Sequence, residues 1–203
     1  MFKHLQKIGK SFMLPIAILP AAGLLLGIGG ALSNPTTVAT YPMLNVPFLQ
    51  GIFGIMTSAG AIVFGNLALL LCIGLCIGLA KRDKGTAALA GAVGFLVMNA
   101  SIGAMLNIWD PGGANIDTGV VGAIAMGLMT GFLHNRYKNI QLPQFLGFFG
   151  GSRFVPIVTS LFAIFIGVIF FIVWPPFQRL LVAAGEGVAA APGAGAGAGV
   201  GAG

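Results

Sequence analysis

The chain has 203 residues, of which 57% are hydrophobic and 7% are charged, and its formal net charge is +6 at pH 7. Soluble globular domains contain about 25% charged residues, so this composition excludes a protein whose whole surface faces water. Nucleic-acid binding is also disfavoured, because the basic residues do not form one stripe with polar and aromatic partners. Attraction to an anionic membrane surface explains the charge better.

Nine of the ten Lys and Arg residues fall in three clusters, which occupy every second gap between long apolar runs. The gaps 34–59 and 109–117 contain no Lys or Arg. Because cytoplasmic loops of membrane proteins retain these residues, we predict a cytoplasmic N-terminus, cytoplasmic clusters and two gaps that face outside. Arg179 is the one exception to the pattern. The clusters are Lys3, Lys7 and Lys10; Lys81, Arg82 and Lys84; and Arg136, Lys138 and Arg153.

The predicted elements begin with residues 1–10, where apolar side chains alternate with lysines as in a short amphipathic helix on the cytoplasmic membrane surface. A solvated basic flank is the alternative. Five apolar windows then approach the roughly 20 residues that a transmembrane helix needs, and helices satisfy their own backbone groups in lipid. The sequence therefore predicts an all-α membrane protein with about five transmembrane helices, at roughly 12–33, 60–80, 86–108, 118–134 and 154–174.

Three local features refine this prediction. Residues 47–58 are apolar but too short to span, so they indicate an interfacial or re-entrant helix on the outside. Pro15 and Pro20 predict a kink or a broken start in the first span, because proline has no backbone donor. Small residues four apart predict close helix packing, at Gly23 with Gly27, Gly74 with Gly78, and Gly127 with Gly131 extended by Ala123.

The search for reactive groups finds few candidates. Cys72 and Cys76 lie one turn apart in an apolar run without a neighbouring His or carboxylate, so we interpret them as small packing residues and predict no metal site. His4 and His134 both lie at predicted cytoplasmic ends, where they indicate polar caps. No cofactor motif and no catalytic residue is present, which leaves enzymatic activity of this chain undecided.

Polar residues inside the predicted spans are the remaining candidates for a binding site. They are Asn66, Asn99, Ser101, Thr130 and Thr159. An asparagine in a membrane helix either joins two helices or binds a ligand such as a sugar hydroxyl. Asn66 and Asn99 are accordingly offered as candidate substrate-binding residues.

The C-terminal residues differ from the rest of the chain. Residues 189–203 contain only Ala, Gly, Pro and one Val, and such a tract has almost no side-chain surface to bury. We therefore predict a disordered Gly- and Ala-rich tail at 183–203, behind a membrane domain at 1–182. The change in composition suggests a truncation, a frameshift or an artificial terminus.

Three segments resemble a known family. LQKIGKSFMLPIAILPAAG at 5–23, AKRDKG at 80–85 and NRYKNIQLPQFLGFFGGSRFVP at 135–156 occur in the order found in enzyme IIC subunits of the bacterial sugar phosphotransferase system. The resemblance is to the glucose, N-acetylglucosamine and maltose branch and extends from about residue 5 to about residue 180. It implies a multi-pass permease of the bacterial inner membrane.

The resemblance also implies a function and partners. Members of the family carry a sugar across the membrane as homodimers, and the sugar is phosphorylated by a phosphocysteine on the IIB component, within a chain of IIA and IIB partners. The first half of such a permease resembles a scaffold that forms the dimer interface. The sugar-contacting His and Glu belong to motifs of the second half that have no match here, so the resemblance implies no catalytic residue at any position.

We therefore expect the N-terminal half of a sugar-phosphotransferase permease that does not transport sugar alone. One alternative is a non-catalytic membrane partner that regulates an intact permease. The other is a small membrane channel unrelated to sugars, which the three ordered matches make the weakest of the three.

Overall fold

The computed structural model describes residues 2–109, 111 and 116–189, with the side chains of 2–5, 14 and 186–189 left aside. Within these ranges the chain is helical and has no strand. The prediction of an all-α protein is confirmed. The elements are α1 (Phe2–Ser11), α2 (Met13–Ser33), α3 (Pro35–Thr40), η1 (Pro42–Leu44), α4 (Pro47–Gly65), α5 (Leu67–Leu79), α6 (Lys84–Trp109), α7 (Gly119–Tyr137), η2 (Gln144–Phe149), η3 (Gly151–Arg153) and α8 (Phe154–Ala189).

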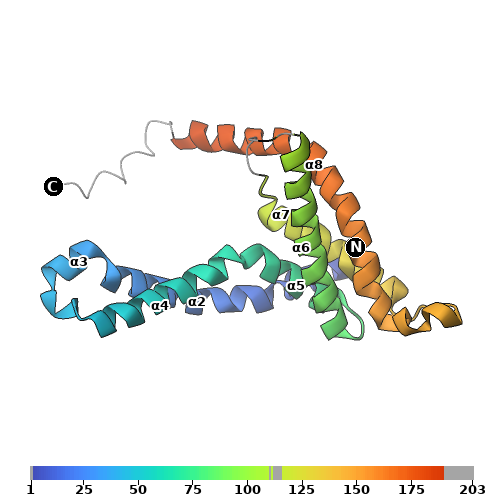
Figure 1. Cartoon of the computed structure of the whole chain (residues 1–203), viewed down its shortest axis with the longest axis horizontal. Coiled ribbons are helices and arrows are strands. Elements are labelled where there is room, and N and C mark those ends of the chain that lie inside the picture. The colour runs from blue at the N-terminus through green and yellow to red at the C-terminus, as the bar shows by residue number, and fades with distance from the viewer. Residues whose placement is uncertain (1, 110, 112–115, 190–203) are drawn as a thin grey trace.

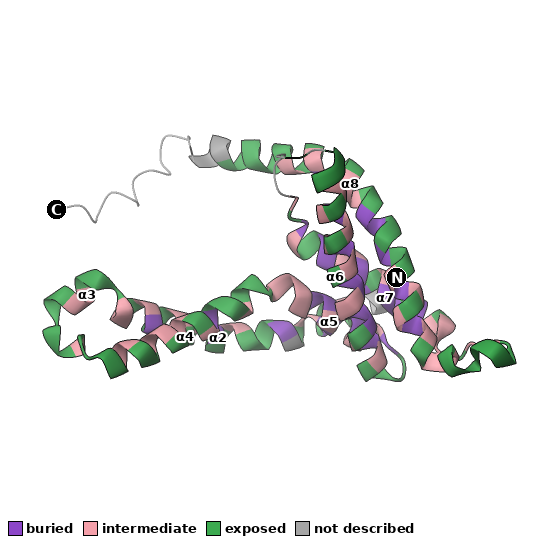
Figure 2. Ribbon diagram, in the orientation of Figure 1, coloured by how far each residue is buried: buried purple, intermediate pink, exposed green. Residues whose placement is uncertain are grey.

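The helices form two parts (Figure 1). Helices α2 and α4 pack along each other as a hairpin, which α3 and η1 close at its far end. Helices α5, α6, α7 and α8 pack as a bundle, and the hairpin extends away from it. Figure 2 shows that buried residues gather in the bundle and are sparse on the hairpin. The hydrophobic core therefore lies among α5–α8, while most of the hairpin surface has no partner within the chain.

Four helices of the described chain are long and apolar enough to cross a membrane. They are Gln6–Ser33, Pro47–Gly65, Lys84–Trp109 and Gly151–Gly185. The predicted spans at 12–33, 86–108 and 154–174 are confirmed as parts of such helices. Helix α7 covers the predicted span at 118–134 but is not one of the four, and its many buried glycines and polar residues fit a helix that contacts protein on several sides.

The predicted span at 60–80 is wrong, because the helical run divides at Asn66. The side-chain Nδ2 of Asn66 donates to the carbonyl of Ile62 at 2.8 Å, where it competes with the regular backbone ladder. Helix α4 instead reaches back to Pro47, whose ring suits a first helical position. Residues 47–58 are thus the first part of a helix that is long and apolar enough to cross a membrane, so the expectation of a separate helix too short to span is also wrong.

The two ends of the chain compare differently with the predictions made for them. A turn at Phe12 separates α1 from α2, so the start of the first span is broken, as Pro15 predicted. Helix α1 has the predicted position, whereas its place on a membrane surface stays a prediction. Helix α8 continues to Ala189, so residues 183–189 are helical where a flexible tail was expected. The remainder of that tail, 190–203, lies outside the described residues.

Close helix contacts confirm two of the three predicted glycine pairs. A Cβ on Gly74 or Gly78 would collide with Pro15 or Ser11. A Cβ on Gly127 or Gly131 would lie 2.9 Å from Leu75 or Leu79 atoms. Without side chains, α5 and α7 approach each other closely. Ala123 is fully buried in the same bundle.

The third pair is wrong. Gly27 has open space around it, and Gly23 has only a distant ring carbon at 4.0 Å. The hairpin closes instead through Gly29 and Gly60, whose added Cβ atoms would lie 2.7 Å from Phe53 O and 2.6 Å from Ala22 O. The sequence spacing identified small residues in α2 but selected the wrong face of the helix.

Candidate functional site

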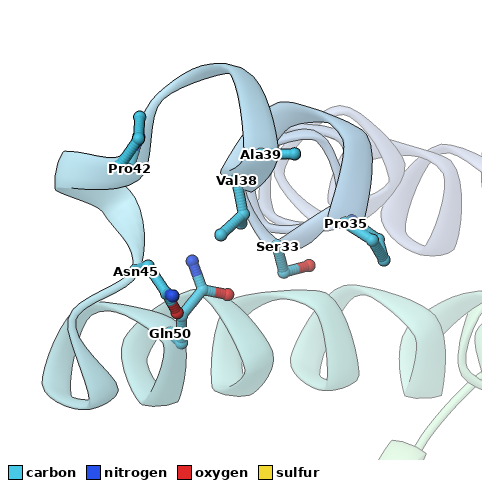
Figure 3. A pocket seen from close by; sticks show the side chains of 7 residues that line it. All are labelled: Ser33, Pro35, Val38, Ala39, Pro42, Asn45 and Gln50. Carbon is cyan, nitrogen blue, oxygen red and sulfur yellow. The ribbon is translucent and has the colours of Figure 1, made fainter.

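A recess of about 530 Å³ lies at the closed end of the α2–α4 hairpin (Figure 3). Gln50 of α4 connects its walls, because its Nε2 donates to Leu44 O at 2.9 Å and to Leu32 O at 3.3 Å. The side chain of Asn45 makes no hydrogen bond with any described residue. The recess thus offers neutral polar groups and no charge, from lining residues Ser33, Pro35, Val38, Ala39, Pro42, Asn45 and Gln50.

Local capping explains the shape of this end. The side-chain oxygen of Asn34 accepts from the backbone N–H of Thr36 at 3.0 Å, and Pro35 follows as the first residue of α3. An Asn cap with proline behind it starts a helix efficiently. The short α3 and η1 then turn the chain back into α4. Sequence reasoning missed this recess, because it depends on how α3 folds against Gln50.

The two predicted substrate-binding residues lie on different helices and are not brought into contact. Asn66 is exposed at the joint of α4 and α5. Asn99 is half-buried on α6, and its Nδ2 donates to Phe95 O at 3.0 Å. In both residues the amide N–H thus serves the residue's own helix. Their Oδ1 atoms accept no hydrogen bond from described residues, so a role in sugar binding stays a prediction.

A polar junction joins α5, α7 and the loop before α6. The Nδ2 of Asn135 donates to Leu79 O at 3.0 Å, and its Oδ1 accepts from the backbone N–H of Lys81 at 3.0 Å. Lys7 of α1 donates from Nζ to the same Leu79 carbonyl at 3.2 Å. One side chain of α7 therefore satisfies the free end of α5, and Lys7 and Lys81, from the first two basic clusters, meet there.

His134 is the second polar residue of this junction. Its ring is fully buried, and Nε2 lies 2.8 Å from Arg82 O. A carbonyl only accepts, so Nε2 carries the proton. Nδ1 is buried without a partner among the described residues. The Nε2 atom of His134 makes a polar contact, as expected of a polar cap, but the complete burial of the ring was not expected. The side chain of His4 lies outside the described residues.

Other polar groups of the bundle are also buried. The hydroxyls of Thr118, Thr130 and Thr159 have no hydrogen-bond partner in the described chain. Ser101 donates to Val97 O at 2.8 Å within its own helix. These groups lie apart from the recess of Figure 3 and do not assemble a reactive centre.

The cysteines pack as predicted. Both are free and fully buried, with the Sγ of Cys72 3.5 Å from Gly91 O and that of Cys76 3.7 Å from Gly127 O. Among the described residues no group of three His, Cys, Asp or Glu side chains is placed to hold a metal ion. The chemistry available here is therefore binding by neutral amides and by basic side chains.

The fold and these sites define a multi-pass α-helical membrane protein with a basic end. Compared with protein families, the chain matches the one described as Phosphotransferase system, EIIC, over residues 9–203. It therefore belongs to this family of sugar permeases, which are multi-pass proteins of the bacterial inner membrane. The match includes residues 183–203, which the sequence analysis had set apart from the membrane domain.

Proposed function

We propose that this chain provides the scaffold and dimer-interface helices of a sugar permease of the glucose, N-acetylglucosamine and maltose branch. Family membership implies a sugar substrate and IIA and IIB partners in general. The branch rests on the segments at 5–23, 80–85 and 135–156. In this proposal the sugar arrives from outside and is phosphorylated by IIB on the cytoplasmic side.

The observation that carries the proposal is the unpartnered hairpin. Large apolar side chains of α2 and α4 remain exposed although the two helices pack together, among them Leu24 at 64%, Ile55 at 71% and Ile62 at 64%. Such a surface is stable against lipid or against another protein. We propose that part of it contacts the hairpin of a second copy, as a dimer scaffold requires.

We further propose that Asn66 and Asn99 face the sugar path and that the described residues do not transport sugar by themselves. What supports the second statement is the polar inventory above: Asn34 caps α3, Gln50 and Asn135 link segments, and no reactive centre assembles among the described residues. Cells that express only this chain are expected to show no uptake of labelled glucose above background. Uptake above background would overturn the statement.

The dimer proposal is tested by cysteine crosslinking in membranes. Ile62→Cys on α4 is expected to crosslink between two differently tagged copies. Ile169→Cys on α8, similarly exposed at 59%, serves as the matched control and is expected to remain monomeric. Equal crosslinking at both positions would contradict the proposed interface. It would also be contradicted if neither position crosslinked and the two tagged copies failed to co-purify.

A further inference from the structure

A second recess, of about 330 Å³, opens at the basic end of the bundle between α1, the end of α5 and α7. We propose that it binds the headgroup of an anionic phospholipid from the surrounding bilayer. Basic pockets between membrane helices are suited to such headgroups. The residues that carry the argument are Lys7, Ile8, Lys81, Leu128, Phe132 and Asn135.

Two ammonium groups supply the positive charge. Lys7 uses one donor on Leu79 O at 3.2 Å, and an ammonium has three donors, so two remain. The side chain of Lys81 is exposed and forms no hydrogen bond or ion pair with any described residue. Asp83, the carboxylate of the neighbouring loop, does not line the recess. A phosphate entering here therefore meets two cations and no lining carboxylate.

The polar junction holds the ammonium group of Lys7 and the backbone of Lys81. Asn135 holds the backbone N–H of Lys81 at 3.0 Å and the carbonyl of Leu79 at 3.0 Å. The ammonium group of Lys7 donates to the same carbonyl. The two lysines thus line the recess from two segments, α1 and the loop after α5. A pre-formed arrangement of this kind binds a charged group without first ordering the walls.

The apolar wall favours a lipid over free phosphate. Leu128 and Phe132 lie one turn apart on α7 and are 39% and 67% exposed, and Ile8 of α1 lines the same recess. A free anion gains nothing from these side chains, whereas the acyl chains below a headgroup cover them. Helix α7 thus presents its exposed apolar side chains next to the two lysines.

The test uses the purified full chain in a neutral detergent and native mass spectrometry with phosphatidylglycerol, phosphatidylcholine or inorganic phosphate. Lys7→Gln/Lys81→Gln is the test variant, and Gln keeps a donor for Leu79 O. Lys10→Gln/Lys84→Gln is the matched control, since it removes the same charge from α1 and from the start of α6, outside the recess. Lys81→Gln alone avoids any loss of an internal bond. Melting temperatures without lipid confirm that each variant is folded.

Phosphatidylglycerol is expected to bind the wild type and the control alike, and to bind the test variant about 30-fold more weakly at low salt. Lys81→Gln alone is expected to weaken binding about fivefold. Equal affinity of test and control variants would overturn the proposal. So would equal binding of phosphatidylcholine, which indicates an apolar groove only, or tight binding of inorganic phosphate, which indicates an anion site without a lipid.

Discussion

At the scale of single residues, Asn135 connects two segments that lie far from it in the sequence. It donates to the last carbonyl of α5 and accepts from the backbone of the following loop. The last carbonyls of a helix have no partner within that helix, so the contact closes α5 from outside. Its neighbour His134 binds the next part of the same loop through Arg82 O. Together they hold the α5–α6 connection against α7.

Replacing Asn135 by alanine is therefore expected to destabilise the bundle by about 1–2 kcal/mol, because two hydrogen bonds are lost. The measurement is the thermal unfolding midpoint of the purified protein in detergent. Asn139→Ala is the control, since Asn139 is exposed and forms no hydrogen bond with described residues. Equal midpoints for the two variants would show that the junction does not stabilise the bundle.

This residue also shows where sequence reasoning stops. The spacing of small residues correctly predicted close packing at Gly127 and Gly131, although it did not say that α5 would be the partner. Nothing in the spacing indicated that Asn135, one turn beyond Gly131, would bond to a helix 56 positions away in sequence. Side-chain bonds between distant segments depend on the packing itself. Asn66 was named for its polarity as a substrate-binding residue, which stays a prediction, and the break that it makes in the helix was missed.

At the scale of elements, glycines decide how closely helices approach. In α4, Gly60 faces α2 so closely that an added Cβ would lie 2.6 Å from both Ala22 O and Leu26 N. Gly54 of the same helix has nothing within 4 Å. A sequence pattern treats these two glycines alike. Only the rotation of α4 against α2 distinguishes the one that packs from the one that does not.

Gly60→Ala is expected to force the α2–α4 hairpin apart and to cost about 1–3 kcal/mol, because the added methyl meets backbone atoms that cannot rotate away. Gly54→Ala is expected to be neutral or to stabilise the helix by about 0.5–1 kcal/mol. Thermal unfolding in detergent compares the pair. A Gly60→Ala protein as stable as Gly54→Ala would mean that the hairpin does not close as described.

Helix α8 contains a second element-scale feature. It changes direction along its length (Figure 1) and holds Pro175 and Pro176 in its interior. Interior prolines remove a helix bond and clash with the preceding turn, which kinks the helix. The predicted span ended at residue 174, immediately before them. The apolar composition thus predicted a span that ends immediately before the two prolines, although α8 itself continues to Ala189.

Replacing both prolines by alanine is expected to straighten α8. Spin labels at Phe162 and Leu181 would then approach the separation of a straight helix, about 28 Å for 19 residues, from a shorter distance in the wild type. Pro156→Ala is the control, because Pro156 lies in the first turn, where a missing donor costs little. An unchanged distance in the double variant would exclude the prolines as the cause of the bend.

At the scale of the whole molecule, the helices run to and from the basic end of the bundle, which holds Lys7, Lys81 and Asn135. Helices α2, α6 and α8 run away from this end, and α4, α5 and α7 run back towards it. The contacts of Lys7, Leu79, Lys81 and Asn135 gather the starts and ends at this side. Trp109, the last residue of α6, lies next to Phe171 in the middle of α8, with ring centroids 6.2 Å apart. The alternation of basic clusters with gaps thus matches the path of the helices, although two of the predicted boundaries were wrong.

The central claim is that this basic end faces the cytoplasm and the α3 end faces outside. It is tested most directly by labelling intact cells with a membrane-impermeant thiol reagent, in a Cys72→Ala/Cys76→Ala background. Ala39→Cys, on exposed α3, is expected to react in intact cells, and Lys84→Cys, at the start of α6, only after permeabilisation. Reaction of Lys84→Cys in intact cells, with Ala39→Cys protected, would contradict the account.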